Sequence, residues 1–253
     1  MKKYILILLP LLLNCGSLDR DNLLDPKNPN SNADQVVLVE LFINDSTGYE
    51  FCDTALETIE DISESENYHD KILVLEYHVK TDDLNDFYAL TSSYERYLKY
   101  VPIQSNRGIP DAFFNGKIER VQGASTEKAK LRYEDVLEEL TGKKAYFRIE
   151  ATKRIEGNSI DLDVKVARLG SWKNENLNLM VVLYEDLGTN FHRNVVRKIF
   201  QHQAINTMKP GEVKSFGFTG QLSGIQKSNA IYALVFVQDQ EETTMEIYQA
   251  AKF

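Results

Sequence analysis

Residues 35–62 read QVVLVELFINDSTGYEFCDTALETIEDI, and they contain the clearest structural pattern in the first half of the chain. The run at 35–42 is short, rich in β-branched side chains and almost continuously apolar, which is typical of a strand buried on both faces of a sheet. After a polar loop, apolar residues between 55 and 62 recur at three- and four-residue spacing, which indicates a helix with one buried face. The sequence therefore predicts a buried strand followed by an amphipathic helix.

Strands and helices continue to alternate up to residue 142. A second buried strand is expected at 71–79 (KILVLEYHV), and helices are expected within 82–100 and at 125–140. Asn115-Gly116 lies between extended runs at 111–114 and 117–121, which favours a hairpin with a type I′ turn. Thr141-Gly142 is a stop signal for the last helix. The resulting order is strand, helix, strand, helix, hairpin, helix.

That order, with the motifs VVLVELF, TGYEFCDTALETIEDI, LEYHV and GIPDAFFNG, resembles the thioredoxin superfamily over about residues 35–140. The sequence is more closely similar to bacterial envelope proteins in which a thioredoxin-like domain precedes a β-rich domain. The resemblance implies that Cys52 is the second cysteine of a C-x-x-C motif, that His78 is the strand-end histidine, and that Pro110 is a loop proline following a cis peptide bond. Tyr49 stands where active members of the family have the first cysteine.

The loss of that first cysteine bears on the chemistry of the site. Thiol–disulfide exchange needs an exposed attacking thiolate and a second thiol to resolve the mixed disulfide. Because Tyr49 replaces the attacking cysteine, we expect Cys52 to be a buried, unreactive side chain and the domain to be redox-inactive. The alternative is a one-cysteine enzyme in which His78 raises the thiolate fraction of Cys52 and an external thiol resolves the intermediate.

Histidines and metal-binding motifs give no further site. His78 closes a buried strand, where a histidine is most often satisfied by a backbone carbonyl, although it would also serve as a base or a ligand. His69 lies at the far end of the same strand segment, while His192 and His202 belong to the second half of the chain. Because no metal-binding motif is present, the sequence predicts neither a metal nor a cofactor.

The segment from 143 to 253 is strand-like almost throughout. The runs at 146–155 and 159–169 alternate apolar and polar residues around a turn at 156–158, and further strands are expected at 177–184, 213–220, 231–238 and 246–251. This pattern predicts an all-β sandwich, resembling the immunoglobulin-like class without its cysteines. The segment Val195-Val196-Arg197 resembles an NVVR stretch in the second domain of the family, and we expect a strand or turn whose Arg197 pairs with a carboxylate.

The N-terminus gives a prediction about location. Lys2 and Lys3 precede an apolar run of about ten residues, which is too short to span a bilayer of roughly 30 Å and is typical of a signal peptide. The following Leu12-Leu13-Asn14-Cys15 resembles the lipobox of bacterial lipoproteins, although a residue smaller than Asn14 is commoner before the cysteine. The resemblance implies that Cys15 carries the lipid anchor. An ordinary secretory signal is the alternative.

Composition and charge limit the remaining classes. The chain is 43% hydrophobic and 26% charged, which is typical of a globular protein and excludes a collagen-like, disordered or polytopic membrane chain. Removing residues 1–14 takes away two lysines and no acid, which leaves 27 basic and 38 acidic residues, so nucleic acid is not an expected partner. The segment 15–34 has the composition of a disordered tether.

Together these patterns predict a signal peptide (1–14), a tether (15–34), an α/β thioredoxin-like domain (35–142) and an all-β sandwich domain (143–253). The predicted protein is lipid-anchored in the cell envelope, most simply in the outer membrane, and acts as a binding or structural module. Its expected partners are the membrane, through the lipid, and another envelope protein. The alternative function is a thiol-dependent oxidoreductase acting through Cys52.

Overall fold

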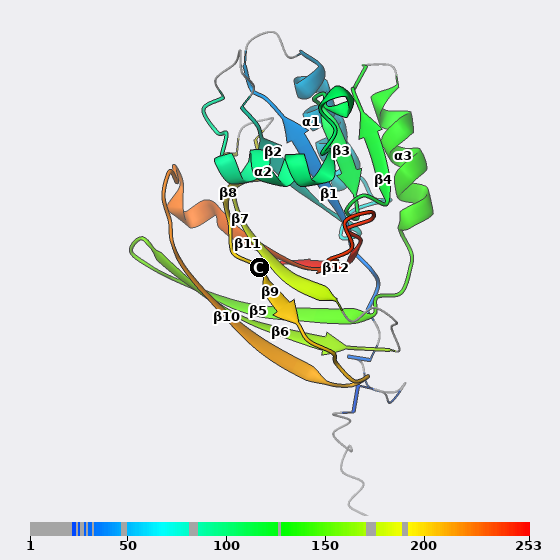
Figure 1. Ribbon diagram of the computed structural model, residues 1–253, viewed down its shortest axis with the longest axis vertical. Helices are drawn as coiled ribbons and strands as arrows, with labels where there is room; N and C mark the ends of the chain where they lie inside the picture. Colours follow the sequence, from blue (N-terminus) through cyan, green and yellow to red (C-terminus); the bar gives the residue numbers. More distant parts are fainter. Residues whose placement is uncertain are drawn as a thin grey trace, which may run out of the picture.

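The computed structural model describes residues 22–23, 25, 28, 30–31, 33–46, 50–80, 86–125, 128–170, 176–188 and 192–253 (Figure 1). The predicted signal peptide, Cys15 and Tyr49 lie outside these residues, as does most of the predicted tether. Every helix in the described part of the chain is too short or too polar to cross a lipid bilayer.

The first half of the chain alternates strands and helices in the predicted order. Its elements are β1 (Val37–Ile43), α1 (Glu50–Glu64), β2 (Ile72–His78), α2 (Thr91–Tyr100), a short 3-10 helix (Gln104–Asn106), β3 (Asp111–Phe114), β4 (Glu119–Gln122) and α3 (Ala129–Leu140). Every residue of β1 is buried, which confirms the prediction of a strand covered on both faces. The apolar residues spaced along α1 are buried as well, so its predicted amphipathic pattern is also confirmed.

Helix α2 is shorter than the sequence indicates. It begins at Thr91, whereas apolar spacing predicts helix from 82 onward; residues 81–85 lie outside the described part of the chain. The reason for the late start is local. The Asp86 carboxylate accepts the backbone N–H groups of Tyr88 and Asp45, each at 2.7 Å. Such side-chain bonds give the backbone an alternative to helix, and they hold a turn before α2.

The hairpin between β3 and β4 has a longer loop than predicted. Asn115 and Gly116 have φ values of 49° and 79°, as a type I′ turn requires, but pairing resumes two residues later than expected. The loop is held by another part of the chain, because the N–H of Lys117 donates to the Thr244 carbonyl at 2.7 Å. A Cβ at Gly116 would lie 2.0 Å from the Met245 carbonyl oxygen, so this position requires glycine.

The second half of the chain is β-rich, as predicted. Its elements are β5 (Phe147–Glu156), β6 (Ser159–Arg168), β7 (Leu177–Glu185), β8 (Val195–Ile199), β9 (Gln203–Ile205), β10 (Val213–Gln221), a short 3-10 helix (Ser228–Ala230), β11 (Ile231–Asp239) and β12 (Ile247–Lys252). Val195, Val196 and Arg197 of the NVVR stretch lie in β8, and Arg197 Nε lies 2.7 Å from Glu185 Oε2, which confirms the expected pairing of this arginine with a carboxylate.

The two halves of the chain share one sheet. Within the described residues its strand order is β12-β11-β7-β8-β2-β1-β3-β4, and β9 pairs with β7. β8 links the halves, since it is parallel to β2 through Glu76 and Val195 and antiparallel to β7. The predicted boundary after residue 142 thus lies in the turn that follows α3, where Gly142 has a φ of 79°, while the sheet continues across it.

A second sheet, in the order β10-β6-β5, faces the β7, β11 and β12 part of the large sheet (Figure 1). Inward-facing residues of β6 are buried at every second position, while Asp163 and Lys165 between them are exposed. The apolar residues of β6, β7 and β11 fill the space between the sheets, so this half has a two-layer core.

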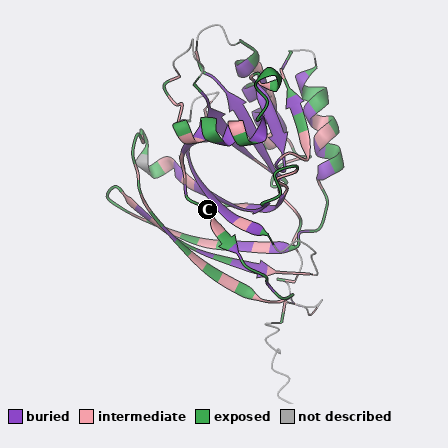
Figure 2. Ribbon diagram, viewed as in Figure 1, coloured by how far each residue is buried: buried purple, intermediate pink, exposed green. Residues whose placement is uncertain are grey.

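The first half packs helices on both faces of the large sheet. Residues of α1 and α3 pack with Val39 and Leu41 on one face. Residues of α2 pack on the other face, where Phe42 and Tyr77 join Val182 and Phe236 from the second half in a single cluster. Figure 2 shows the resulting band of buried residues along the central strands. One core therefore contains side chains from both halves of the chain.

Candidate functional site

Cys52 lies in the first turn of α1 and is buried, as the sequence indicated. Only 1% of the residue is exposed, and its thiol is free. Burial raises the pKa of the thiol to about 12, and the carboxylates of Asp53, Asp86 and Asp45 act in the same direction. The Asn44 backbone N–H opposes this shift without reversing it. Near pH 7 Cys52 is therefore a neutral thiol with almost no nucleophilic form.

The other residues of the predicted degenerate active-site loop lie as follows. The Ile109-Pro110 peptide bond is cis, so that prediction is confirmed. Pro110 is buried directly before β3, and its carbonyl accepts the N–H of Gly123 at 2.7 Å. His78 forms its hydrogen bond with Asp86 instead of with Cys52. The described contacts thus give no Cys52–His78 nucleophile pair.

His78 ends β2 and points into a buried group of carboxylates. Its Nδ1 lies 2.8 Å from Asp86 Oδ2, and its Nε2 lies 3.8 Å from Glu76 Oε2. Burial alone would lower the pKa of the imidazole, but the Asp86 and Glu76 carboxylates outweigh it and raise the pKa to about 9. At this strand end the histidine is held by carboxylates, whereas the sequence suggested a backbone carbonyl.

Glu76 and His78 lie two residues apart on β2, so their side chains project from the same face. Glu76 Oε1 accepts the backbone N–H groups of Arg193 and Asn194 at 3.1 and 2.7 Å, directly before β8. Glu76 Oε2 lies 3.4 Å from His192 Nδ1. Burial would raise the pKa of the Glu76 carboxyl, but the nearby His192 and His78 side chains lower it.

The continuous sheet therefore brings His192 beside His78, and the rings are 5.3 Å apart. The sequence analysis placed His192 in the second half of the chain and expected no site that includes it. That expectation was wrong, because the β2–β8 pair joins the halves at this point. One ligand atom from each of Glu76, His78 and His192 lies within 4.8 Å of the others, so these three residues could hold a metal ion. The alternation of β2 places Glu76 with His78, but no sequence signal indicates which strand pairs with β2.

More acidic groups surround this cluster. Glu60 on α1 is buried, and its Oε1 has no hydrogen-bond partner among the described residues. Burial and the nearby Glu76 carboxylate raise the pKa of Glu60 to about 7. Asp45 Oδ1 lies 3.6 Å from His192 Nε2. Carboxylates therefore surround the two histidines, while Arg193 lies near Glu60 as a positive charge.

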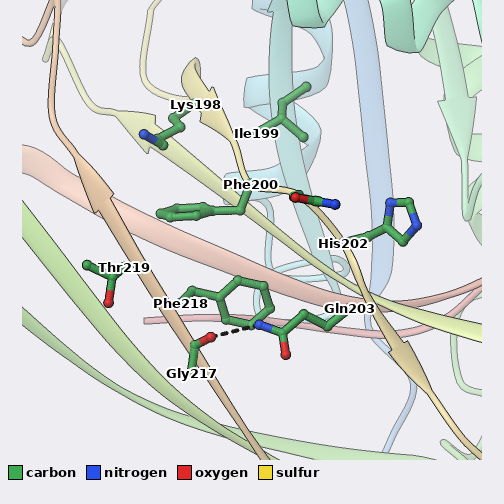
Figure 3. Close-up of a pocket in the computed structure, with 9 residues that line it drawn as sticks. Lys198, Ile199, Phe200, His202, Gln203, Gly217, Phe218 and Thr219 are labelled. Atoms are coloured by element: carbon green, nitrogen blue, oxygen red, sulfur yellow. Dashed lines mark hydrogen bonds between the residues drawn. The ribbon is translucent and has the colours of Figure 1, made fainter.

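The remaining histidines lie elsewhere. His69 is exposed in the turn before β2 and lies 3.5 Å from Asp70. His202 lines an open groove of about 500 Å³ between residues 198–203 and 217–219, where Gln203 donates to the Gly217 carbonyl at 2.7 Å (Figure 3). This groove begins at the end of β8 opposite His192. Among its lining residues, Lys198 and His202 are the titratable ones.

Comparison with known proteins identifies the fold. No protein-family model and no curated protein matches this chain. The structure of HBP35 of Porphyromonas gingivalis is similar, with 13% sequence identity and a TM-score of 0.65 over 87% of this chain and 75% of that chain. At this identity the similarity shows a shared overall fold.

Two further solved structures match smaller parts. A domain of the outer membrane lipoprotein Omp28 from Porphyromonas gingivalis is 21% identical, with a TM-score of 0.32 over 43% of this chain and 86% of that one. Beta-glucosidase 3B from Thermotoga neapolitana is 10% identical, with a TM-score of 0.29 over 43% of this chain and 16% of that one. Each aligns with less than half of the present chain.

Proposed function

We propose that this chain is a lipid-anchored protein of the bacterial cell envelope in which a redox-inactive thioredoxin-like unit and an immunoglobulin-like sandwich act together as a binding or structural module. Support for the thioredoxin-like unit comes from its sheet order β2-β1-β3-β4, with β1 parallel to β2 and antiparallel to β3. The placement of α1 and α3 on one face and α2 on the other supports it further.

The state of Cys52 is the observation that carries the proposal. A cycle between dithiol and disulfide needs two thiols, and the sequence contains only Cys15 and Cys52. The Cys52 thiol is buried with a raised pKa, so it lacks the thiolate that attacks a disulfide. A protein with this fold and this thiol retains its surfaces for binding but has no redox centre.

Insulin reduction tests the absence of redox chemistry. With dithiothreitol as reductant, the rate of insulin precipitation in the presence of the protein should equal the rate with Cys52→Ser. Both rates should match the reaction without protein, because no thiolate is available to carry electrons. Turnover by the unmodified protein that is lost in Cys52→Ser would instead support the single-cysteine oxidoreductase.

The anchor is tested by fractionation. Cys15 follows a short apolar segment and would carry two or three acyl chains, which bind a membrane far more firmly than one chain does. Cys15→Ser should abolish labelling by a fatty-acid precursor and should move the protein from the outer-membrane fraction to the soluble fraction. Cys52→Ser is the matched control and should leave both labelling and fractionation unchanged. Membrane association that survives Cys15→Ser would refute the anchor.

A further inference from the structure

We infer that Glu76, His78 and His192 form a binding site for a divalent transition-metal ion at the junction of β2 and β8. Glu76 Oε2 lies 3.4 Å from His192 Nδ1 and 3.8 Å from His78 Nε2. Ligand atoms bound at about 2.0–2.1 Å to a tetrahedral zinc ion lie roughly 3.4 Å apart. Two of the three separations are therefore close to the spacing that such an ion requires, and the two histidine nitrogens lie within 4.8 Å of each other.

The orientation of His78 suits a metal ligand. Its Nδ1 faces the Asp86 carboxylate at 2.8 Å, which leaves Nε2 as the atom directed at the cluster. This Nε2 is buried and has no hydrogen-bond partner among the described residues. A metal-binding histidine commonly bonds a carboxylate through its other ring nitrogen, and Asp86 supplies that carboxylate here. An ion would also bind a buried polar atom that otherwise makes no hydrogen bond among the described residues.

Glu76 is oriented in a comparable way. Its Oε1 is occupied by two backbone N–H groups, those of Arg193 and Asn194. Its Oε2 is left facing both histidines. Because the strand and two hydrogen bonds fix the carboxylate, it needs no rearrangement to present one oxygen to an ion. The carboxylate is thus already ordered by folding before an ion binds.

His192 completes the set from the second half of the chain. Its Nδ1 faces Glu76, and its Nε2 lies 3.6 Å from Asp45 Oδ1, so a second carboxylate stands behind this ring. The His192 side chain is 14% exposed, whereas those of Glu76 and His78 are fully buried. An ion would therefore enter from the His192 side.

The ligand set selects the kind of ion. Two imidazoles and one carboxylate suit zinc and neighbouring first-row ions, while calcium and magnesium prefer oxygen ligands. Three protein ligands leave a fourth tetrahedral position for water or for a small bound ligand. An ion held there would also connect β2 to the segment before β8, and so would stabilise the junction between the halves.

A network of ion pairs without metal is the competing account. It explains the contact of His78 with Asp86, but the 3.8 Å separation from Glu76 is beyond hydrogen-bond distance. It leaves His78 Nε2 in an ion pair with Glu76 but without a hydrogen bond in the described part of the chain. The two accounts differ in whether the protein binds one equivalent of metal through these three residues.

Calorimetric titration with Zn²⁺ separates them. The chain carrying Cys15→Ser, freed of metal with a chelator, should bind one equivalent of Zn²⁺. His192→Gln should weaken binding at least about 100-fold, since loss of an outer partner alone costs about 10–100-fold. Asp86→Asn, which changes such an outer partner, should weaken binding by about 10–100-fold. An exposed histidine outside the cluster is the control, so His202→Gln should bind like the parent protein.

A measurement on the parent protein covers the case in which a variant fails to fold. X-ray absorption of the Zn²⁺-loaded chain should show two imidazole nitrogens and two oxygens around the ion, with no sulfur. Absence of one-to-one binding would overturn the inference. So would equal loss of binding in His202→Gln and His192→Gln, or a spectrum with fewer than two imidazoles.

Discussion

Arg96→Met should lower the free energy of unfolding by about 3–5 kcal/mol, because it leaves the carboxylate of Glu40 buried without its counter-charge. Glu40 lies in the middle of β1, where every residue is buried, and Arg96 projects toward it from α2. Chemical denaturation followed by far-UV circular dichroism measures this loss.

The geometry of the Arg96–Glu40 pair explains why so large a loss of unfolding free energy is expected. Arg96 Nε lies 2.5 Å from Glu40 Oε1, and Arg96 Nη2 lies 2.9 Å from Glu40 Oε2, so the guanidinium donates a bidentate pair of hydrogen bonds to the carboxylate. Tyr100 donates its hydroxyl to Glu40, and Gln238 on β11 donates to the Tyr100 hydroxyl at 3.1 Å. The network therefore spans both halves of the chain, and its loss affects the shared core.

Two companion variants isolate the cause. Arg154→Met makes the same change at an exposed arginine beside Asp161 and should cost less than about 1 kcal/mol. The double variant Arg96→Met with Glu40→Leu should be more stable than Arg96→Met alone, because neither charge then remains buried. If Arg96→Met costs no more than Arg154→Met, the buried pair does not make the expected contribution to the free energy of unfolding.

The buried pair also shows where prediction from sequence ends. The apolar run around Glu40 predicts a buried strand, and the spacing in α1 predicts its helix, because both patterns are local. The carboxylate of Glu40 is tolerated in that strand only because Arg96, from an element 56 residues later, lies against it. Local periodicity carries no information about such a partner.

The same limit explains the candidate site. The burial of Cys52 could be predicted from its position among the apolar residues of α1, and the cis bond before Pro110 could be predicted from a family resemblance. The cluster at Glu76 depends on a single residue pair between β2 and β8, which joins segments more than 100 residues apart. Only the folded sheet brings His192 to His78, so the sequence indicated neither the cluster nor a metal.

The proposed loss of redox chemistry depends on an unreactive Cys52. A thiol reacts with alkylating reagents as the thiolate, and burial raises the Cys52 pKa from 9.0 to about 12. At a pH near 7.5 the thiolate population is then roughly a thousandfold smaller than for a free cysteine. The enclosing residues of the core limit access of the reagent further, since only 1% of Cys52 is exposed.

Alkylation of Cys52 in the native chain carrying Cys15→Ser is the most direct measurement. With iodoacetamide at pH 7.5, labelling should be at least about a thousandfold slower than in guanidinium chloride, because it requires local or global unfolding. The matched control places the thiol on the exposed side of the same helix, as Glu57→Cys in a Cys52→Ser background, and should label rapidly without denaturant. Slow native labelling of Cys52 is expected if its thiol is buried and neutral. Native labelling within tenfold of the Glu57→Cys control would contradict it and would restore Cys52 as a reactive thiol.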